Sequence, residues 1–139
     1  MPAGLMRLSL LALALVTATA AAAQPMPGML SINDGEPVRV ASAAAVGRVL
    51  QRCARPNGCT SVYLETCQMC ILSAQARRGG FAITSRLGPP GPEYELFDRR
   101  TGRARRRVFN AAAMIAIFAA YVCGPEPRFV GSIRIEDNE

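Results

Sequence analysis

Residues 62–78, VYLETCQMCILSAQARR, decide the fold, because this stretch combines features of a strand and of a helix. Its start, residues 60–64, has the β-branched and aromatic residues typical of a strand. Its body favours a helix, since at 100° per residue one face collects Tyr63, Cys67, Cys70, Ile71 and Ala74. Two arginines followed by Gly79-Gly80 are a typical helix stop. We therefore expect a helix over residues 62–78.

Four strand patterns and one helix pattern follow. Residues 111–123 form a largely apolar run that Asn110 can cap and that Gly124-Pro125 ends. Residues 98–102 begin with Asp and end with Gly, which suits the turn of a hairpin. Alternating residues predict strands over residues 81–87 and 129–135. Residues 93–97 and 103–109 look like two further strands, joined through the turn of residues 98–102.

The segments before residue 60 are less regular. Residues 24–36 contain Pro, Gly, Asn and Asp without periodicity, and we expect a flexible lead-in there. A short strand is expected over residues 38–40, and Ser42 can cap a helix over residues 43–55. Helices and strands mix without regular alternation, which favours an α+β fold. The sequence predicts one small disulfide-stabilised domain over residues 37–139, with about three helices packed on a short, mostly antiparallel sheet.

Residues 1–23 are organised like a secretory signal peptide. One arginine precedes the apolar run LSLLALALV, and small residues follow up to an Ala-x-Ala cleavage site ending at Ala23. The alternative is an uncleaved membrane anchor, but a membrane span needs about 20 apolar residues. Cleavage leaves 116 residues with 15 arginines and 10 acidic residues. We predict an exported protein, periplasmic or extracellular, and the Ala-rich, lysine-free composition is typical of a bacterial protein.

Residues 108–123 are the one long apolar run of the mature chain. The run has 16 residues and is rich in Ala, which is shorter and less apolar than a membrane span of about 20 residues. After export, the arginines before it would also lie on the wrong side of a membrane. We therefore expect a buried helix and no transmembrane segment in the mature chain.

The composition removes most common catalytic arrangements. The chain has no His, and all 16 of its basic residues are Arg. It therefore lacks a Ser-His-Asp triad, an imidazole ligand and a Schiff-base lysine. The spacing of the carboxylates Glu65, Glu93, Glu95 and Asp98 does not indicate a cleft. We predict a non-enzymatic protein with no catalytic residue and no cofactor.

Five cysteines indicate disulfides in an exported protein: Cys53, Cys59, Cys67, Cys70 and Cys123. Cys53 and Cys59 flank a turn, so their Cα atoms can approach within the roughly 4.4–6.8 Å that a disulfide needs, and we expect this bridge. Cys123 would then pair with Cys67 or Cys70. Because the number is odd, one thiol is left over, which allows a homodimer through a bond between two copies.

Cys67-Gln68-Met69-Cys70 supports a second interpretation. The C-x-x-C spacing occurs in thiol–disulfide oxidoreductases, and Met69 adds a thioether that Cu(I) accepts. In a redox protein the motif begins a helix, whereas here it lies about five residues inside the expected one. The motif alone also falls short of the four ligands of a structural zinc site.

Residues 99–107 form a basic segment with six guanidinium groups: Arg99, Arg100, Arg103, Arg105, Arg106 and Arg107. Guanidinium binds phosphate and carboxylate through two parallel hydrogen bonds, so the expected partner is an acidic protein or an anionic envelope component. Nucleic acid is not expected, because the protein is exported and only 8 aromatic residues, none of them Trp, are available for stacking. The competing interpretation is a solvated hairpin whose charges pair with Glu93, Glu95 and Asp98.

Together these features predict a small exported binding or accessory protein that contacts an anionic partner through its basic segment. The alternative is a periplasmic thiol-redox or copper-handling protein that uses Cys67 and Cys70.

Overall fold

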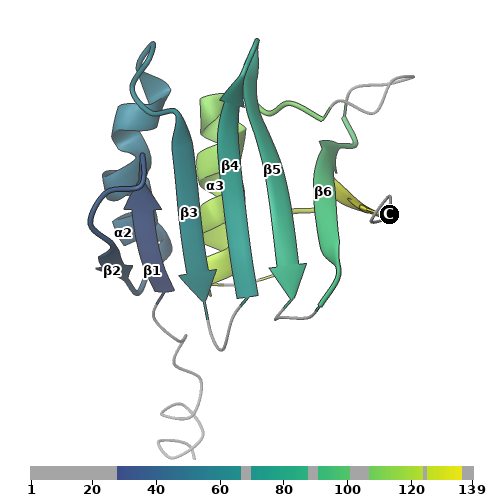
Figure 1. The fold of residues 1–139 in the computed structure, drawn as a ribbon, viewed down its shortest axis with the longest axis horizontal. Coiled ribbons are helices and arrows are strands. Elements are labelled where there is room, and N and C mark those ends of the chain that lie inside the picture. The colour runs from purple at the N-terminus through teal and green to yellow at the C-terminus, as the bar shows by residue number, and fades with distance from the viewer. Residues whose placement is uncertain (1–27, 67–69, 88–90, 101–106, 124, 136–139) are drawn as a thin grey trace, which may run out of the picture.

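The computed structural model describes residues 28–66, 70–87, 91–100, 107–123 and 125–135. Seven strands form one antiparallel sheet in the order β2-β1-β3-β4-β5-β6-β7, and the helices lie behind it in the view of Figure 1. The strands are β1 (Gly28–Ile32), β2 (Val38–Val40), β3 (Ser61–Thr66), β4 (Cys70–Arg77), β5 (Gly80–Leu87), β6 (Glu93–Asp98) and β7 (Val130–Arg134).

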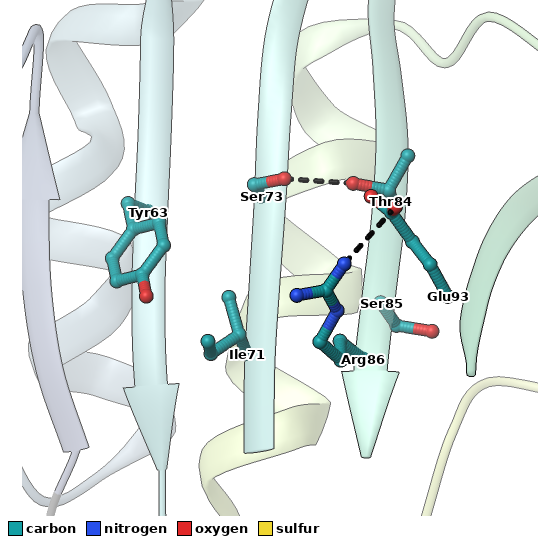
Figure 2. A pocket seen from close by; sticks show the side chains of 7 residues that line it. All are labelled: Tyr63, Ile71, Ser73, Thr84, Ser85, Arg86 and Glu93. Atoms are coloured by element: carbon teal, nitrogen blue, oxygen red, sulfur yellow. Dashed lines mark hydrogen bonds and ion pairs between the residues drawn. The ribbon is translucent and has the colours of Figure 1, made fainter. Parts of the chain in front are cut away.

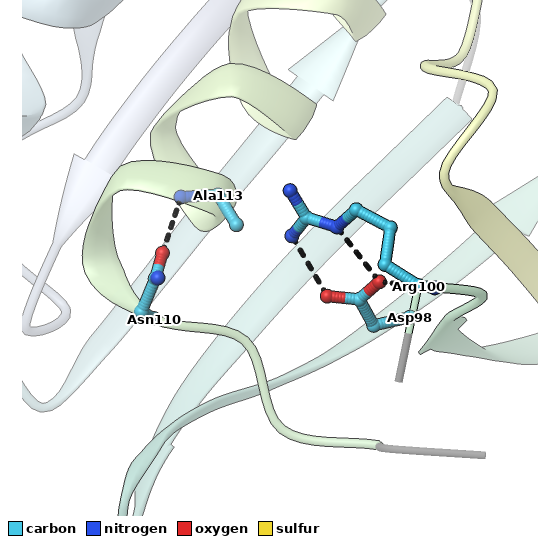
Figure 3. Close-up of polar contacts among 4 residues, drawn as sticks. All are labelled: Asp98, Arg100, Asn110 and Ala113. Atoms are coloured by element: carbon cyan, nitrogen blue, oxygen red, sulfur yellow. Dashed lines mark hydrogen bonds and ion pairs between the residues drawn. The ribbon is translucent and has the colours of Figure 1, made fainter. Parts of the chain in front are cut away.

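Two α-helices cover one face of this sheet, and both begin at the predicted caps. The helix α2 (Ala43–Leu50) continues into the short 3-10 helix η1 (Gln51–Ala54), and the helix α3 spans Ala111–Cys123. The Oγ of Ser42 accepts a hydrogen bond from the Ala45 backbone N at 3.1 Å. The Oδ1 of Asn110 accepts one from the Ala113 backbone N at 2.8 Å (Figure 3). Each cap satisfies a backbone donor that the first helical turn leaves without a partner.

The core lies between the helices and the inner face of the sheet. Every second residue of the central strands turns inward, because side chains alternate between the two faces of a strand. The fully buried strand residues include Leu30, Leu64, Leu72, Ile83 and Leu96, and the helices add Val46, Leu50, Met114, Ile117 and Phe118. Within the described residues, no helix covers the opposite face of the sheet (Figure 1). Side chains on that face, such as Tyr63 and Glu65, are exposed.

The predicted fold is wrong in its proportions: two helices lie on a seven-stranded sheet, in place of about three helices on a short sheet. The difference arises mainly in residues 62–78, which form the strands β3 and β4 and not a helix. Their register pairs Val62 with Ala74 and Leu64 with Leu72, and all four are buried. The stripe that suggested a helix therefore mixed residues from the two faces of the sheet, since Tyr63 is 40% exposed and Ala74 is buried.

Two further segments differ from prediction. Residues 28–32, expected in the flexible lead-in, form β1, which pairs with both β2 and β3. The strand expected over residues 103–109 lies largely outside the described residues, and its last residue, Phe109, forms an isolated bridge with Phe81 of β5. The partners of β6 are instead β5 and β7.

The elements predicted over residues 38–40, 81–87, 93–97, 111–123 and 129–135 are present with bounds that agree to within one residue. Among the helices of the described ranges, none has both the length and the apolar character that a membrane span needs.

Candidate functional site

The basic segment, residues 99–107, begins at a buried carboxylate. Asp98, the last residue of β6, is 6% exposed. Its Oδ1 accepts hydrogen bonds from the backbone N and the Nε of Arg100 at 2.9 and 3.0 Å, and its Oδ2 accepts one from Nη2 at 2.8 Å (Figure 3). The Arg100 guanidinium also lies over the ring of Phe129, 4.1 Å from its centroid. The hydrogen bond to Asp98 raises the pKa of Arg100, so this guanidinium stays charged.

The other end of the basic segment is also attached to the sheet. Nη1 of Arg107 lies 3.3 Å from Oε2 of Glu95 on β6. Two residues later, Phe109 exchanges two backbone hydrogen bonds with Phe81, at 2.8 and 2.9 Å. The basic segment therefore starts and ends on the body of the fold, and both paired arginines keep more than half of their side-chain surface exposed, at 56% for Arg100 and 57% for Arg107.

Of the six arginines in the basic segment, the structure describes Arg99, Arg100 and Arg107, whereas Arg103, Arg105 and Arg106 lie outside the described residues. The predicted intramolecular pairing is present for Asp98 and Glu95. The third carboxylate, Glu93, pairs instead with Arg86 of β5 at 3.5 Å.

Other arginines lie at the same end of the sheet as the basic segment. Arg77 ends β4 opposite Gly80, and Arg78 lies in the turn between them. Phe81, next to Gly80, pairs with Phe109, which lies two residues after Arg107 of the basic segment. Figure 1 shows this β4–β5 turn at the same end of the sheet as the start of α3. Folding thus collects arginines from separate parts of the sequence at one end of the sheet.

A small polar cluster joins Arg99 to the end of α3. Loss of water raises the pKa of Tyr121, and the neighbouring Glu126 raises it further, while a hydrogen bond from Ser85 opposes the shift. Partial burial likewise raises the pKa of Glu126, against the opposing effects of Tyr121 and Arg99. The cluster includes one carboxylate that favours its neutral form more than usual, close to an arginine of the basic segment.

A second polar region lies on the face of the sheet that has no helix over it. It is a hollow of about 280 Å³. In it Ser73 and Thr84 share a hydrogen bond of 2.7 Å, and Arg86 pairs with Glu93 (Figure 2). Tyr63, 40% exposed, forms one side. Because both signs of charge are present and paired, this hollow does not favour an anion.

The cysteines are divided between described and undescribed positions. The predicted Cys53–Cys59 disulfide is confirmed, with Cα atoms 5.0 Å apart. Cys70 is half-buried at the start of β4, opposite Thr66, and Cys123 ends α3, whereas Cys67 and Met69 lie outside the described residues. Since Cys70 begins β4, this part of the motif does not lie inside the helix that was predicted over residues 62–78. The pairing of Cys67, Cys70 and Cys123 stays a prediction.

Within the described ranges, no group of three or more His, Cys, Asp or Glu side chains is placed to hold a metal ion. Comparison with protein-family models, with curated proteins and with solved structures finds no match for this chain.

The contacts that hold the basic segment were only partly predictable. Asp98 and Glu95 were expected as partners because they lie on the adjacent strand. The stacking of Arg100 on Phe129 was missed, since these residues are far apart in the sequence and no local pattern connects them.

Proposed function

We propose that the protein is a small exported, non-enzymatic binding protein that contacts an anionic partner through its basic segment. The partner is an acidic protein or an anionic component of the cell envelope. The compartment is the periplasm or the extracellular medium, as the signal peptide and the disulfide favour.

The observation that carries this proposal is a local excess of positive charge that neighbouring carboxylates do not balance. Residues 93–107 contain six arginines and three acidic residues, so a charge of +3 remains even if every carboxylate pairs. Glu126, near Arg99, reduces this excess by one more charge. An excess of this size creates a field that attracts and orients an anionic surface.

The attachment of the basic segment adds to the argument. Its start is fixed through Asp98 and its end through the pairing of Phe109 with Phe81. Arg100 and Arg107 are therefore held by their carboxylate partners before a ligand binds, which favours affinity. Because the arginines of the pairs remain more than half exposed, their unused N–H groups are accessible to phosphate or carboxylate oxygens.

The proposal is tested with the mature chain, residues 24–139, immobilised and exposed to a native envelope extract at low and at high salt. We expect one anionic partner to be retained at low salt and released at high salt, because salt screens exposed charges beyond about 10 Å at 0.1 M. Replacing Arg103, Arg105, Arg106 and Arg107 by Gln should weaken the retained interaction about tenfold or more.

A matched control removes the same charge elsewhere. Arg39, Arg48, Arg86 and Arg134 are exposed and lie outside both the basic segment and the β4–β5 turn. Their combined replacement by Gln gives the same net charge as the first variant. If the control loses the partner to the same extent, overall charge and not the basic segment mediates binding, and the proposal is wrong. Retention that does not depend on salt would equally contradict it.

A further inference from the structure

A second basic feature lies beside the basic segment, in a hollow of about 420 Å³. Three parts of the chain surround it: the loop closed by the Cys53–Cys59 disulfide, the turn between β4 and β5, and the first residues of α3. Its volume lies within the range of about 300–1,000 Å³ that is usual for small-molecule sites. No local sequence pattern marks this site.

The charged side chains around this hollow are all positive. Arg55 and Arg77 both line it, and among the described residues around it there is no Asp or Glu. This distinguishes it from the hollow on the open face of the sheet, where Glu93 pairs with Arg86. Two guanidinium groups without a carboxylate between them favour an anionic ligand.

Donors remain available on both arginines. Within the described residues, the side chain of Arg55 makes no hydrogen bond or ion pair. Arg77 donates from Nη1 to the carbonyl oxygen of Ala76 at 3.2 Å and from Nη2 to Oε1 of Gln75 at 2.8 Å. A guanidinium has five N–H groups, so Arg77 retains three for a ligand.

The walls of the hollow are held in place by local contacts. The Arg52 Nε donates to the carbonyl oxygen of Gly58 at 3.0 Å, within the disulfide loop, and the Ala76 backbone N donates to the carbonyl oxygen of Thr60 at 2.8 Å. Gly80 packs so closely on the carbonyl oxygen of Phe109 that a Cβ there would overlap it. A site that is already formed requires little ordering when a ligand enters.

The remaining wall is largely apolar, with Pro56, Ala76 and the nearly buried Phe81. We propose that this hollow binds a small organic oxyanion, whose phosphate or carboxylate group meets Arg55 and Arg77 and whose short apolar body lies against Pro56, Ala76 and Phe81. The site goes beyond the proposed macromolecular partner, because its arginines lie outside the basic segment.

The test titrates the mature protein with butyl phosphate, butyrate and inorganic phosphate, followed by the backbone amide signals in NMR. We expect saturable shifts at Gly79, Gly80 and Ala111, and tighter binding of butyl phosphate than of inorganic phosphate, because only the former has an apolar body. A preference between butyl phosphate and butyrate identifies which oxyanion the site favours.

Three variants make the result decisive. Replacing Arg55 and Arg77 by Gln should weaken the binding of butyl phosphate at least tenfold. The variant R39Q/R134Q, which has the same change of charge, should bind butyl phosphate as tightly as the original protein does. Ala76→Leu should weaken the binding of butyl phosphate more than that of inorganic phosphate, because the larger side chain fills the space along the apolar wall. Thermal unfolding of each variant checks that the fold is kept.

The quadruple Gln variant of the basic segment separates this site from the proposed function. It should keep butyl phosphate binding although it loses the macromolecular partner. Shifts that map to Arg99 and Arg107, shifts that never saturate, or equal behaviour of R55Q/R77Q and R39Q/R134Q would each overturn the proposal.

Discussion

The carboxylate of Asp98 holds the guanidinium of Arg100 through two side-chain hydrogen bonds, at 3.0 and 2.8 Å, while accepting a third from the Arg100 backbone N at 2.9 Å. The carboxylate side of this pair is buried, with 8% of the side chain exposed, whereas the guanidinium side is 56% exposed. The pair therefore fixes the start of the basic segment and leaves the positive charge at the surface.

This asymmetry gives a first prediction. Asp98→Ala should lower the free energy of unfolding by about 1–3 kcal/mol, because it removes an acceptor of several hydrogen bonds, one of them from the backbone. Arg86→Gln is the comparison, since it breaks an ion pair whose two side chains are 46% and 40% exposed. That loss should be below about 1 kcal/mol. Urea unfolding of both variants measures the difference, and equal losses would mean that the Asp98 contacts contribute no more than a surface pair.

Much of the C-terminal half of the fold follows from local sequence. Asn110 caps α3 because its side chain accepts from the backbone three residues on, and the apolar run to Cys123 has no competing turn residue. In the strand β5, the buried Phe81 and Ile83 alternate with the less buried Ala82 and Thr84, as predicted. In these segments the local pattern and the tertiary structure agree.

Residues 62–78 could not be assigned in the same way. Val62, Leu64, Leu72 and Ala74 lie on the inner face of the sheet. The stripe that suggested a helix instead mixed the two faces, because it joined the exposed Tyr63 with the buried Ala74. Only the pairing of β3 with β1 and of β4 with β5, which are contacts between distant residues, selects the hairpin.

The hollow beside the disulfide loop illustrates why sites are harder to predict than elements. Arg55 and Arg77 belong to different elements and lie outside the dense run of residues 99–107, so composition directs attention away from them. Their proximity depends on the pairing of β3 with β4, which was itself not predicted.

Two glycines offer opposite tests of packing. A Cβ at Gly131 of β7 would overlap the ring of Phe97, whereas one at Gly47 of α2 would meet nothing within 4 Å. Gly131→Ala should therefore destabilise the protein by about 1–3 kcal/mol through overpacking. Gly47→Ala should stabilise it by about 0.5–1 kcal/mol, because alanine loses less backbone freedom in a helix. Thermal unfolding of both variants gives the sign of each change in stability. A loss of stability in Gly47→Ala would contradict the open surroundings of that position.

The disulfide gives a third prediction. Its cysteines are six positions apart, and closing so short a loop stabilises the folded state by about 2 kcal/mol in the chain-entropy description. C53A/C59A should lose about that much free energy of unfolding. Reductant should then destabilise the original protein more than the variant. Any effect of reductant that persists in C53A/C59A reports a bond made by the other three cysteines, and an unchanged stability of the variant would show that the bridge contributes nothing.

A fourth prediction concerns pH and the carboxyl of Glu126. Its pKa is raised above the usual 4.5 by partial burial, which outweighs the opposing effects of Tyr121 and Arg99. The folded state then binds this proton more tightly than the unfolded state, so the contribution of Glu126 to stability is fully present below pH 4.5 and is lost as the pH rises through the folded pKa. Glu126→Gln removes the ionisation and should be more stable than the original protein at pH 7, with a difference that shrinks towards zero on acidification below pH 4.5. Glu36→Gln, at an exposed position of the β1–β2 connection, removes the same charge and serves as the control. Thermal unfolding from pH 3 to pH 8 measures the stability of both variants. If stability depends on pH in the same way in Glu126→Gln and Glu36→Gln, the pKa of Glu126 is not raised.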